Sequence, residues 1–413
     1  MKLDAIKIKK MLLDFSVGNF RSFKSIESIT MLAQSQKENS NDPRITKVGK
    51  HHILKTKSIY GSNGSGKSNL AKAILAFWHT ITSSGKIDGA LAQSMHPFIL
   101  NEKNPKEPCF FQMTYYHEGI TYRYGFEADR DKIFSEWLFG TKQREVCYFL
   151  RNNLDIEIKS NNFSDGLKFL NVFGKNKHVI KSNSLFLSTL IDSGSPQAML
   201  VSKFFQNFYI VTGLQDSTLM AYSSLRMEQE DDAKRIIDFI RKADLQIDTL
   251  GFEYQKDGRK RLLSRHIVFD EQNKPSNKKI AMDFIDTQSE GTKKMFEIAP
   301  LIIDAVNKNT VLVIDEFDAR LHPKLTLELI ETLHSTKNKA GQLIYMTHDT
   351  NLLDPEIQRK DQITFVEKDS VASSHIYSLA EIKGVRSDLY ARDYLLGKFG
   401  AIPILDDYEA IIQ

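Results

Sequence analysis

Gly61-Ser-Asn-Gly-Ser-Gly-Lys67-Ser68 decides the fold, because it fits the pattern G-x-x-x-x-G-K-[ST] between a predicted strand ending at Tyr60 and a predicted helix beginning near Lys67. Its glycines let backbone N–H groups surround phosphate oxygens, and the helix N-terminus adds partial positive charge. We expect Lys67 to reach the β- and γ-phosphates of a nucleotide and Ser68 to bind Mg²⁺. The alternative is a glycine turn that only starts a helix. The predicted nucleotide ligands are Gly61, Asn63, Gly64, Gly66, Lys67, Ser68 and Asn69.

A second motif lies far along the chain, where the apolar run Val311–Ile314 is followed by two acids, Asp315 and Glu316. Such a run predicts a buried parallel strand. We expect Asp315 to help hold Mg²⁺ and Glu316 to orient or deprotonate an attacking water. The alternative is a buried strand that happens to end in an acid.

Two further segments flank this strand in the sequence. Ser289-Glu-Gly-Thr292 precedes a predicted helix over Lys294–Val306, and Thr347-His348 follows a second predicted parallel strand at Leu343–Met346. A Ser-x-Gly turn at a helix N-terminus can hold a γ-phosphate with hydroxyl and backbone donors, here from Ser289 and Gly291. An N-cap serine is the equally good alternative.

The order of these four motifs resembles that of ABC-type ATPases. The sequences of these motifs are similar to those of soluble ATPases related to OLD, RecF and SMC proteins. They are most similar to the RloA and AriA branch of bacterial anti-phage and abortive-infection systems. The resemblance covers roughly residues 11–100 and 283–405. The segments that carry it are Tyr60–Asn69, Ser289–Thr292, Asp315–Pro323, Thr347–Asn351, Asn19–Phe23, Asp361–Lys368 and Tyr394–Ala401.

The resemblance implies the roles of several residues. His348 contacts the γ-phosphate and acts with Glu316 in catalysis, and Asp318 lies in the D-loop beside the nucleotide. The cofactors are ATP and Mg²⁺. The Ser289 turn completes the site of a partner chain, so the resemblance implies a homodimer with sandwiched ATP, which assembles further into a higher homo-oligomer. Gln93 is the candidate for the Q-loop glutamine, and the adenine contact is not identified.

The implied fold class is α/β: an ABC-ATPase (P-loop) head with a mixed β-sheet and flanking helices, plus an inserted, mainly helical middle region. We place an N-terminal lobe at 1–139, an inserted lid or interaction region at 140–282 and a C-terminal lobe at 283–413. Alternating Tyr- and Phe-rich segments over 109–139 predict antiparallel strands with a turn at Glu118-Gly119, and Ala233–Ala243 reads as a helix.

The resemblance also implies a function: an ATP-hydrolysing sensor or scaffold of an anti-phage system that controls a separate toxin or nuclease, typically of the Toprim type. Val366–Asp369 is similar to the first acidic motif of such a nuclease, but only 44 residues follow Asp369, too few for that domain. The alternative is an ATPase of DNA repair or maintenance like RecF and SMC proteins. A transporter subunit is disfavoured, since Ser289–Thr292 is not the LSGGQ signature.

Composition sets wider limits on the class of protein. The chain has 413 residues, 41% of them hydrophobic, a net charge of +4 and two cysteines. It has no apolar run near the ~18 residues of a membrane span, and no signal-peptide core in its first ten residues. We therefore expect a cytoplasmic protein without a membrane partner, with Met11 as an alternative start. Residues 256–279 hold eight Lys or Arg against three acids, which predicts either contact with DNA or, preferably, a solvated hairpin.

Overall fold

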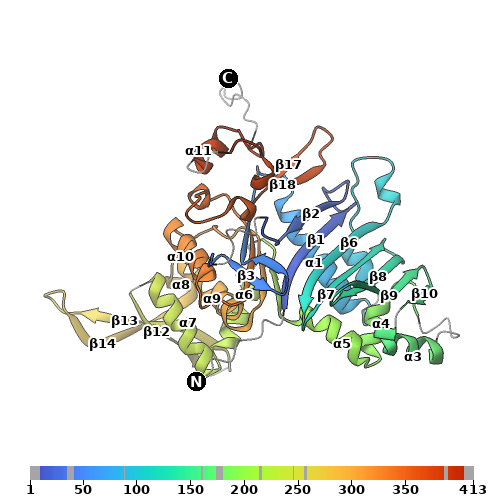
Figure 1. Ribbon diagram of the computed structural model, residues 1–413. Coiled ribbons are helices and arrows are strands. Elements are labelled where there is room, and N and C mark those ends of the chain that lie inside the picture. The colour runs from blue at the N-terminus through green and yellow to red at the C-terminus, as the bar shows by residue number, and fades with distance from the viewer. Residues whose placement is uncertain are drawn as a thin grey trace.

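The computed structural model describes residues 10–34, 41–87, 89–159, 161–173, 180–213, 216–244, 246–254, 258–385 and 389–403 (Figure 1). The first nine residues, which bear on the alternative start at Met11, lie outside these ranges. Two sheets dominate the described part: one of six strands and one of seven. No helix within it is long and apolar enough to cross a lipid bilayer.

The six-stranded sheet carries the motifs. Its order is β11-β15-β16-β5-β17-β18, with parallel pairing throughout except for β18, which is antiparallel to β17. The predicted mixed sheet and its parallel strands are therefore confirmed. Its strands are β5 (Thr56–Tyr60), β11 (Phe208–Val211), β15 (Val311–Ile314), β16 (Gln342–Met346), β17 (Ile363–Lys368) and β18 (Ser374–Ser378).

Two helices that flank β15 in the sequence pack on this sheet through apolar stripes. Ile298, Leu301 and Ile302 of one helix, and Leu329 and Leu333 of the other, are buried in one cluster with side chains of β15 and β16. Their spacing of three or four residues places them on one face of each helix. The helices of this part of the molecule are α6 (Asp216–Arg226), α7 (Glu230–Ala243), α8 (Phe284–Thr287), α9 (Glu290–Lys308) and α10 (Pro323–His334).

The seven-stranded sheet is antiparallel, in the order β10-β9-β8-β7-β6-β1-β2. The predicted turn at Glu118-Gly119 is confirmed, with φ of 47° and 88°. The sheet continues through β9 and β10, beyond residue 139, and the domain boundaries stay a prediction. Its strands are β1 (Lys10–Gly18), β2 (Glu27–Thr30), β6 (Cys109–His117), β7 (Ile120–Ala128), β8 (Ile133–Thr141), β9 (Glu145–Asn152) and β10 (Asp155–Ile158).

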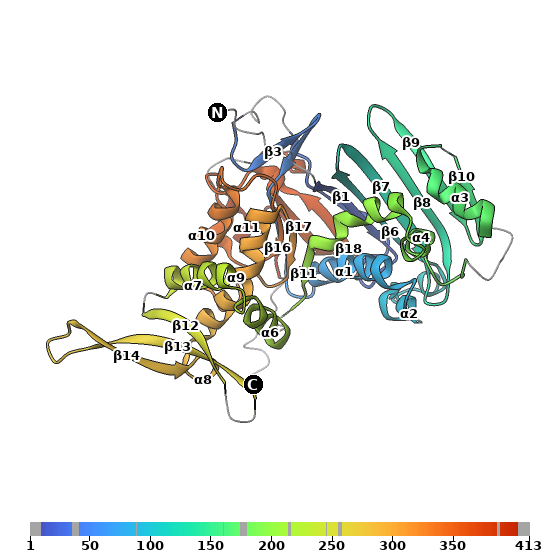
Figure 2. The same ribbon diagram turned by 90° about the horizontal axis from the view of Figure 1, so that it is seen from below.

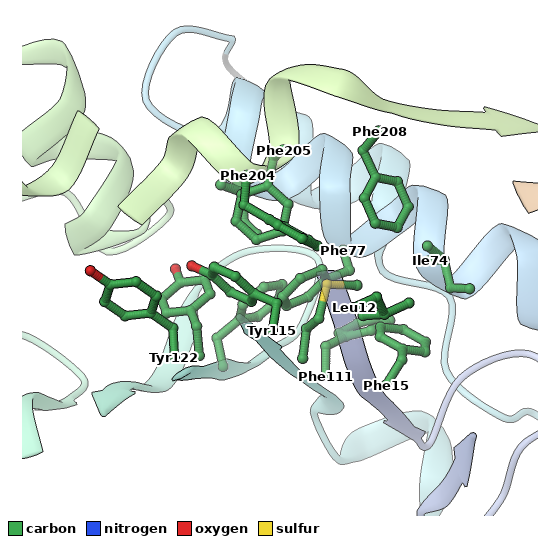
Figure 3. Close-up of a cluster of buried hydrophobic side chains, with 14 of the residues drawn as sticks. Leu12, Phe15, Ile74, Phe77, Phe111, Tyr115, Tyr122, Phe204, Phe205 and Phe208 are labelled. Atoms are coloured by element: carbon green, nitrogen blue, oxygen red, sulfur yellow. The ribbon is translucent and has the colours of Figure 1, made fainter. Parts of the chain in front are cut away.

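An aromatic core joins this sheet to helix α1 (Lys67–Ser83), which begins at the P-loop lysine (Figure 3). The Phe77 ring stacks on Phe126 with centroids 5.6 Å apart, and it meets Phe15 in an edge-on contact at 5.8 Å. The buried Gln342 side chain of β16 accepts a hydrogen bond from Leu12 N at 2.6 Å and donates to Leu12 O at 3.0 Å. The two sheets are thus joined through α1 and through Gln342.

The middle region contains strands besides the expected helices. Strand β11 joins the six-stranded sheet, and β12 to β14 form a separate sheet that projects from the body (Figures 1 and 2). The strands of this separate sheet are exposed on much of both faces. Their sequences therefore lack the alternation of apolar and polar residues that predicts a strand. The remaining elements are α2 (Ala90–Ser94), α3 (Ser164–Phe173), α4 (Phe186–Asp192), α5 (Pro196–Ser202), α11 (Tyr390–Leu395), β3 (Ile45–Val48), β4 (His51–Leu54), β12 (Ile247–Tyr254), β13 (Lys260–Phe269) and β14 (Pro275–Asp283).

The basic segment forms the predicted hairpin, β13–β14. Ion pairs seen within the described residues engage Lys260 with Glu228, Arg261 with Asp283, and Lys279 with Asp248. These pairs lower the charge available to a nucleic acid, which favours the interpretation as a solvated hairpin. Lys256 lies outside the described residues.

Candidate nucleotide site

The three motif-bearing strands lie side by side, with β16 between β5 and β15. Met346 pairs with Ile59, and Tyr345 pairs with Ile314. Since parallel strands end at the same edge of a sheet, the segments that follow them emerge next to one another. The P-loop, the Asp315-Glu316 pair and His348 are therefore brought to one edge, although they are far apart in the sequence.

The P-loop follows a path that only glycine can take at two positions. Gly61 has φ of 157° and Gly66 has φ of 116°. A Cβ on Gly61 would lie 2.3 Å from Val366 O, and a Cβ on Gly66 would lie 2.3 Å from the Ser374 hydroxyl. The loop is thus pressed against β17 and β18, while a Cβ on Gly64, with φ of 75°, would meet nothing within 4 Å. This cradle has the shape and the donors to take phosphate groups.

Lys67 is held at the loop by backbone carbonyls. Its ammonium donates to Gly61 O at 2.7 Å and Ser62 O at 3.0 Å. Burial lowers the pKa of Lys67 to about 8, and the carboxylates of Asp315, Asp318 and Glu316 oppose that shift. A further anionic group beside this ammonium would favour its charged form more strongly. The buried Ser65 hydroxyl has no hydrogen-bond partner in the described part.

Two serines that the sequence analysis did not single out clamp the loop. The Ser374 hydroxyl donates to Ser65 O at 2.5 Å and lies 2.8 Å from the Ser22 hydroxyl. The side-chain amide of Asn69, predicted to bind nucleotide, donates to the same Ser22 hydroxyl at 2.9 Å. Ser22 lies within the Asn19–Phe23 motif, but Ser374 carries no signal in sequence.

The side chains of Asp315, Glu316 and Phe317 alternate between buried and exposed positions. Asp315 is 3% exposed, and its backbone N–H donates to Val211 O at 2.9 Å. Phe317 is fully buried, and its N–H donates to Met346 O at 3.0 Å. Glu316, between them, has φ of 52° and an exposed side chain. A left-handed backbone at a residue with a side chain is strained, and here the buried neighbours impose it. The carboxylate of Glu316 is consequently directed outward.

His348 and Asp318 lie beside this pair. The backbone N–H of His348 donates to the Asp318 carboxylate, with distances of 3.3 and 3.4 Å to its two oxygens. Partial burial lowers the pKa of His348, and the Lys67 ammonium lowers it further against the opposing effect of Asp318. Glu316 opposes the lowering of the pKa of both Lys67 and His348, so its carboxylate lies close enough to act on both groups.

The Ser289 turn caps helix α9. The Ser289 hydroxyl accepts a hydrogen bond from Thr292 N at 3.2 Å, so the N-cap interpretation is confirmed, and the phosphate role of Ser289 and Gly291 stays a prediction. The turn opens on a cavity of about 330 Å³. Its lining residues include none from the P-loop: Ala243, Asp244, Ser289, Gly291, Thr292, Met295, Arg320, His322 and Leu325.

Gln93 lies on the short helix α2, with an exposed side chain. Its carbonyl contacts the His96 ring at 3.0 Å, and α2 is anchored to α1 by a hydrogen bond of 2.9 Å between Ser94 and His79. His79 is twelve positions beyond Lys67, or about 18 Å along an α-helix. The assignment of Gln93 to the Q-loop stays a prediction.

Comparison with known proteins relates this site to one family. The model of the family described as "AAA domain, putative AbiEii toxin, Type IV TA system" matches residues 58–354, which include the P-loop, the Ser289 turn, the Asp315-Glu316 pair and His348. No curated protein sequence matches the chain. Among solved structures, the SMC head domain from Thermotoga maritima is 14% identical with a TM-score of 0.41, over 89% of this chain and 98% of that one. The Smc head domain with a coiled coil and joint derived from Pyrococcus yayanosii is 12% identical with a TM-score of 0.46, over 94% and 100%.

The position of the Ser374 hydroxyl, 2.3 Å from where a Cβ on Gly66 would lie, predicts unequal costs for two glycine substitutions. Gly66→Ala should lower the free energy of unfolding by about 3 kcal/mol, because a strained backbone adds to overlap with the Ser374 hydroxyl. Gly64→Ala, the matched control, meets only the cost of its left-handed backbone, about 1 kcal/mol. Urea unfolding without nucleotide measures both. Equal losses would show that β18 does not constrain the loop.

Proposed function

The chain belongs to the family described as "AAA domain, putative AbiEii toxin, Type IV TA system", and we propose that it is an ATPase that binds ATP with Mg²⁺ and hydrolyses it between two copies of the chain. One observation carries the proposal: Lys67, Asp315, Glu316 and His348 meet at one edge of the six-stranded sheet. Four groups of these types at that place match the needs of phosphoryl transfer.

The P-loop supplies the binding function. Its backbone N–H groups and the N-terminus of α1 surround the phosphates, and the Lys67 ammonium exchanges its carbonyl contacts for phosphate oxygens. Ser68 and Asp315 are the residues that would hold Mg²⁺, which neutralises phosphate charge when bound. The pairing of Asn69 with Ser22 supports a role in fixing the loop, in addition to its predicted contact with nucleotide.

The catalytic residues for hydrolysis are Glu316 and His348. The exposed Glu316 carboxylate can orient a water and accept its proton, which an inward-facing carboxylate could not do. Burial and the Lys67 ammonium lower the pKa of His348 and favour a neutral ring before nucleotide binds. A ring N–H can then be offered to the γ-phosphate. Asp318 fixes the backbone of His348 at this position.

We infer dimerisation from the position of the Ser289 turn. The cavity at Ser289 has no P-loop residue in its lining, so a γ-phosphate held by Lys67 in the same chain is not what fills it. In the proposed dimer each Ser289 turn faces the nucleotide of the other chain. ATP then acts as the contact that joins two subunits, and higher homo-oligomers form from these dimers.

The cellular role that we propose is that of a sensor or scaffold in bacterial anti-phage defence, which controls a separate toxin or nuclease such as a Toprim protein. The assignment to anti-phage defence rests on the resemblance to the RloA and AriA branch, and the family description adds only that related domains occur in a Type IV TA system. DNA repair or maintenance is the alternative. It is favoured by those cations of the β13–β14 hairpin that form no ion pair within the described ranges, among them Arg265. Tight DNA binding by the purified chain alone would favour that alternative over effector control.

Glu316→Gln should keep ATP bound and lower kcat at least about a hundredfold, since the amide cannot accept the proton of water. Loss of one negative charge near the γ-phosphate should also stabilise the ATP-bound dimer. Phosphate release and sedimentation with ATP measure the two effects. Glu328→Gln, an exposed position on α10, is the control and should behave as wild type. Wild-type turnover by Glu316→Gln would remove Glu316 from the catalytic role.

The hydrolysis rate of the wild type should rise faster than linearly with protein concentration near the dimer dissociation constant.

Ser289→Arg should prevent ATP-dependent dimerisation while each chain still binds ATP, because bulk and charge would occupy the position of the partner's γ-phosphate. Mixing Ser289→Arg with Lys67→Ala creates a dimer with one intact composite site, and activity returns if one site can act alone. A Ser289→Arg protein that dimerises and hydrolyses ATP normally would overturn the sandwich.

A further inference from the structure

Two side chains of the Ser289 turn form a hydrogen-bonded chain with a carboxylate that lies outside the turn, that of Asp244. The hydroxyls of Ser289 and Thr292 lie 2.9 Å apart, and the Thr292 hydroxyl lies 3.1 Å from Oδ2 of Asp244. An ionised carboxylate only accepts hydrogen bonds, so Thr292 must donate its single hydroxyl proton to Asp244. The Thr292 oxygen is then left to accept, and Ser289 donates its own proton to it. The Ser289 hydroxyl proton therefore points inward, toward the Thr292 oxygen, which in turn donates to Asp244.

Asp244 comes from the middle region of the sequence. It follows helix α7 directly, and its backbone N–H donates to Ile240 O at 2.8 Å. Its other oxygen, Oδ1, accepts from Gln246 N at 3.1 Å. No Lys, Arg or His in the described ranges forms an ion pair with it. Arg320, which lines the same cavity, is paired with Glu290 at 3.1 Å. The negative charge of Asp244 thus faces the cavity beside Ser289 with no ion-pair partner among the described residues.

This arrangement opposes the proposed use of the turn. A γ-phosphate is anionic and needs hydrogen-bond donors, yet the one proton of Ser289 is committed to the chain that ends at Asp244. To bind phosphate, Ser289 must rotate this proton outward, and the phosphate must approach a second negative charge. Both requirements weaken the ATP-bound dimer.

We infer that Asp244 is a positioning residue that restrains assembly of the ATP sandwich by holding the Ser289 hydroxyl inward. The inference rests on the proposed function of the Ser289 turn. Because Asp244 ends α7, a partner that binds the middle region and shifts this end would release Ser289 and promote closure of the dimer. The middle region thereby gains a physical route to the ATP site.

The test compares three variants in the Glu316→Gln background, in which ATP is not consumed. Asp244→Ala removes both the charge and the acceptor, and should lower the dimer dissociation constant in ATP about tenfold or more, since a committed hydrogen bond to a charged group is released in both sites. Asp244→Asn keeps an acceptor for Thr292, so it should lower the constant by a smaller factor. Asp238→Asn removes an exposed charge of the same helix and should change nothing.

A second readout separates positioning from general folding effects. With Glu316 intact, Asp244→Asn should reduce the protein concentration that gives half-maximal ATPase activity and leave the rate at saturating protein unchanged. Unchanged or weaker dimerisation of both Asp244 variants, with a parent that dimerises in ATP, would overturn the inference alone. Failure of the Glu316→Gln parent to dimerise in ATP would instead contradict the proposed function.

Discussion

The parallel pairing of β16 between β5 and β15 is the constraint on which the site depends. The register of these strands fixes where the three following segments leave the sheet. Met346 pairs with Ile59, and Tyr345 pairs with Ile314. If one of these strands shifted by one residue, Lys67 would be displaced from the acids that follow β15, and the side chains of the shifted strand would turn to the opposite face of the sheet. The chemistry of the site is thus set by backbone hydrogen bonds between strands that are distant in sequence.

Helix α1 transmits this order to the rest of the molecule. One end of it carries Lys67, and further along Phe77 packs into the aromatic core of the antiparallel sheet. The buried Gln342 side chain ties β16 to the first strand. The P-loop is therefore held from three directions: by its own strand, by α1, and by Ser374 of β18. A loop held in this way needs little reorganisation to bind phosphate, which is the condition for tight binding.

The sequence was most informative where the determinants are local. The P-loop, the buried strands beside it and the Glu118-Gly119 turn could be predicted, because glycine spacing and apolar runs encode them over a few residues. Contacts across the chain could not: Ser374 meets the P-loop only after β18 has paired, and Asp244 meets Thr292 only after α7 has packed beside α9. Strand β11 was missed because four residues carry too little pattern, and the exposed β12–β14 sheet lacks a buried face that would give one.

The central claim is that this edge of the sheet binds ATP through Lys67, and calorimetric titration with Mg²⁺–ATP tests it most directly. The wild-type chain should bind one ATP, and Lys67→Ala should bind it roughly a hundredfold more weakly, because a cation that donates to the phosphates is lost. Lys72→Ala, a change of the same kind further along α1, should bind as the wild type does. Wild-type affinity in Lys67→Ala would contradict the account.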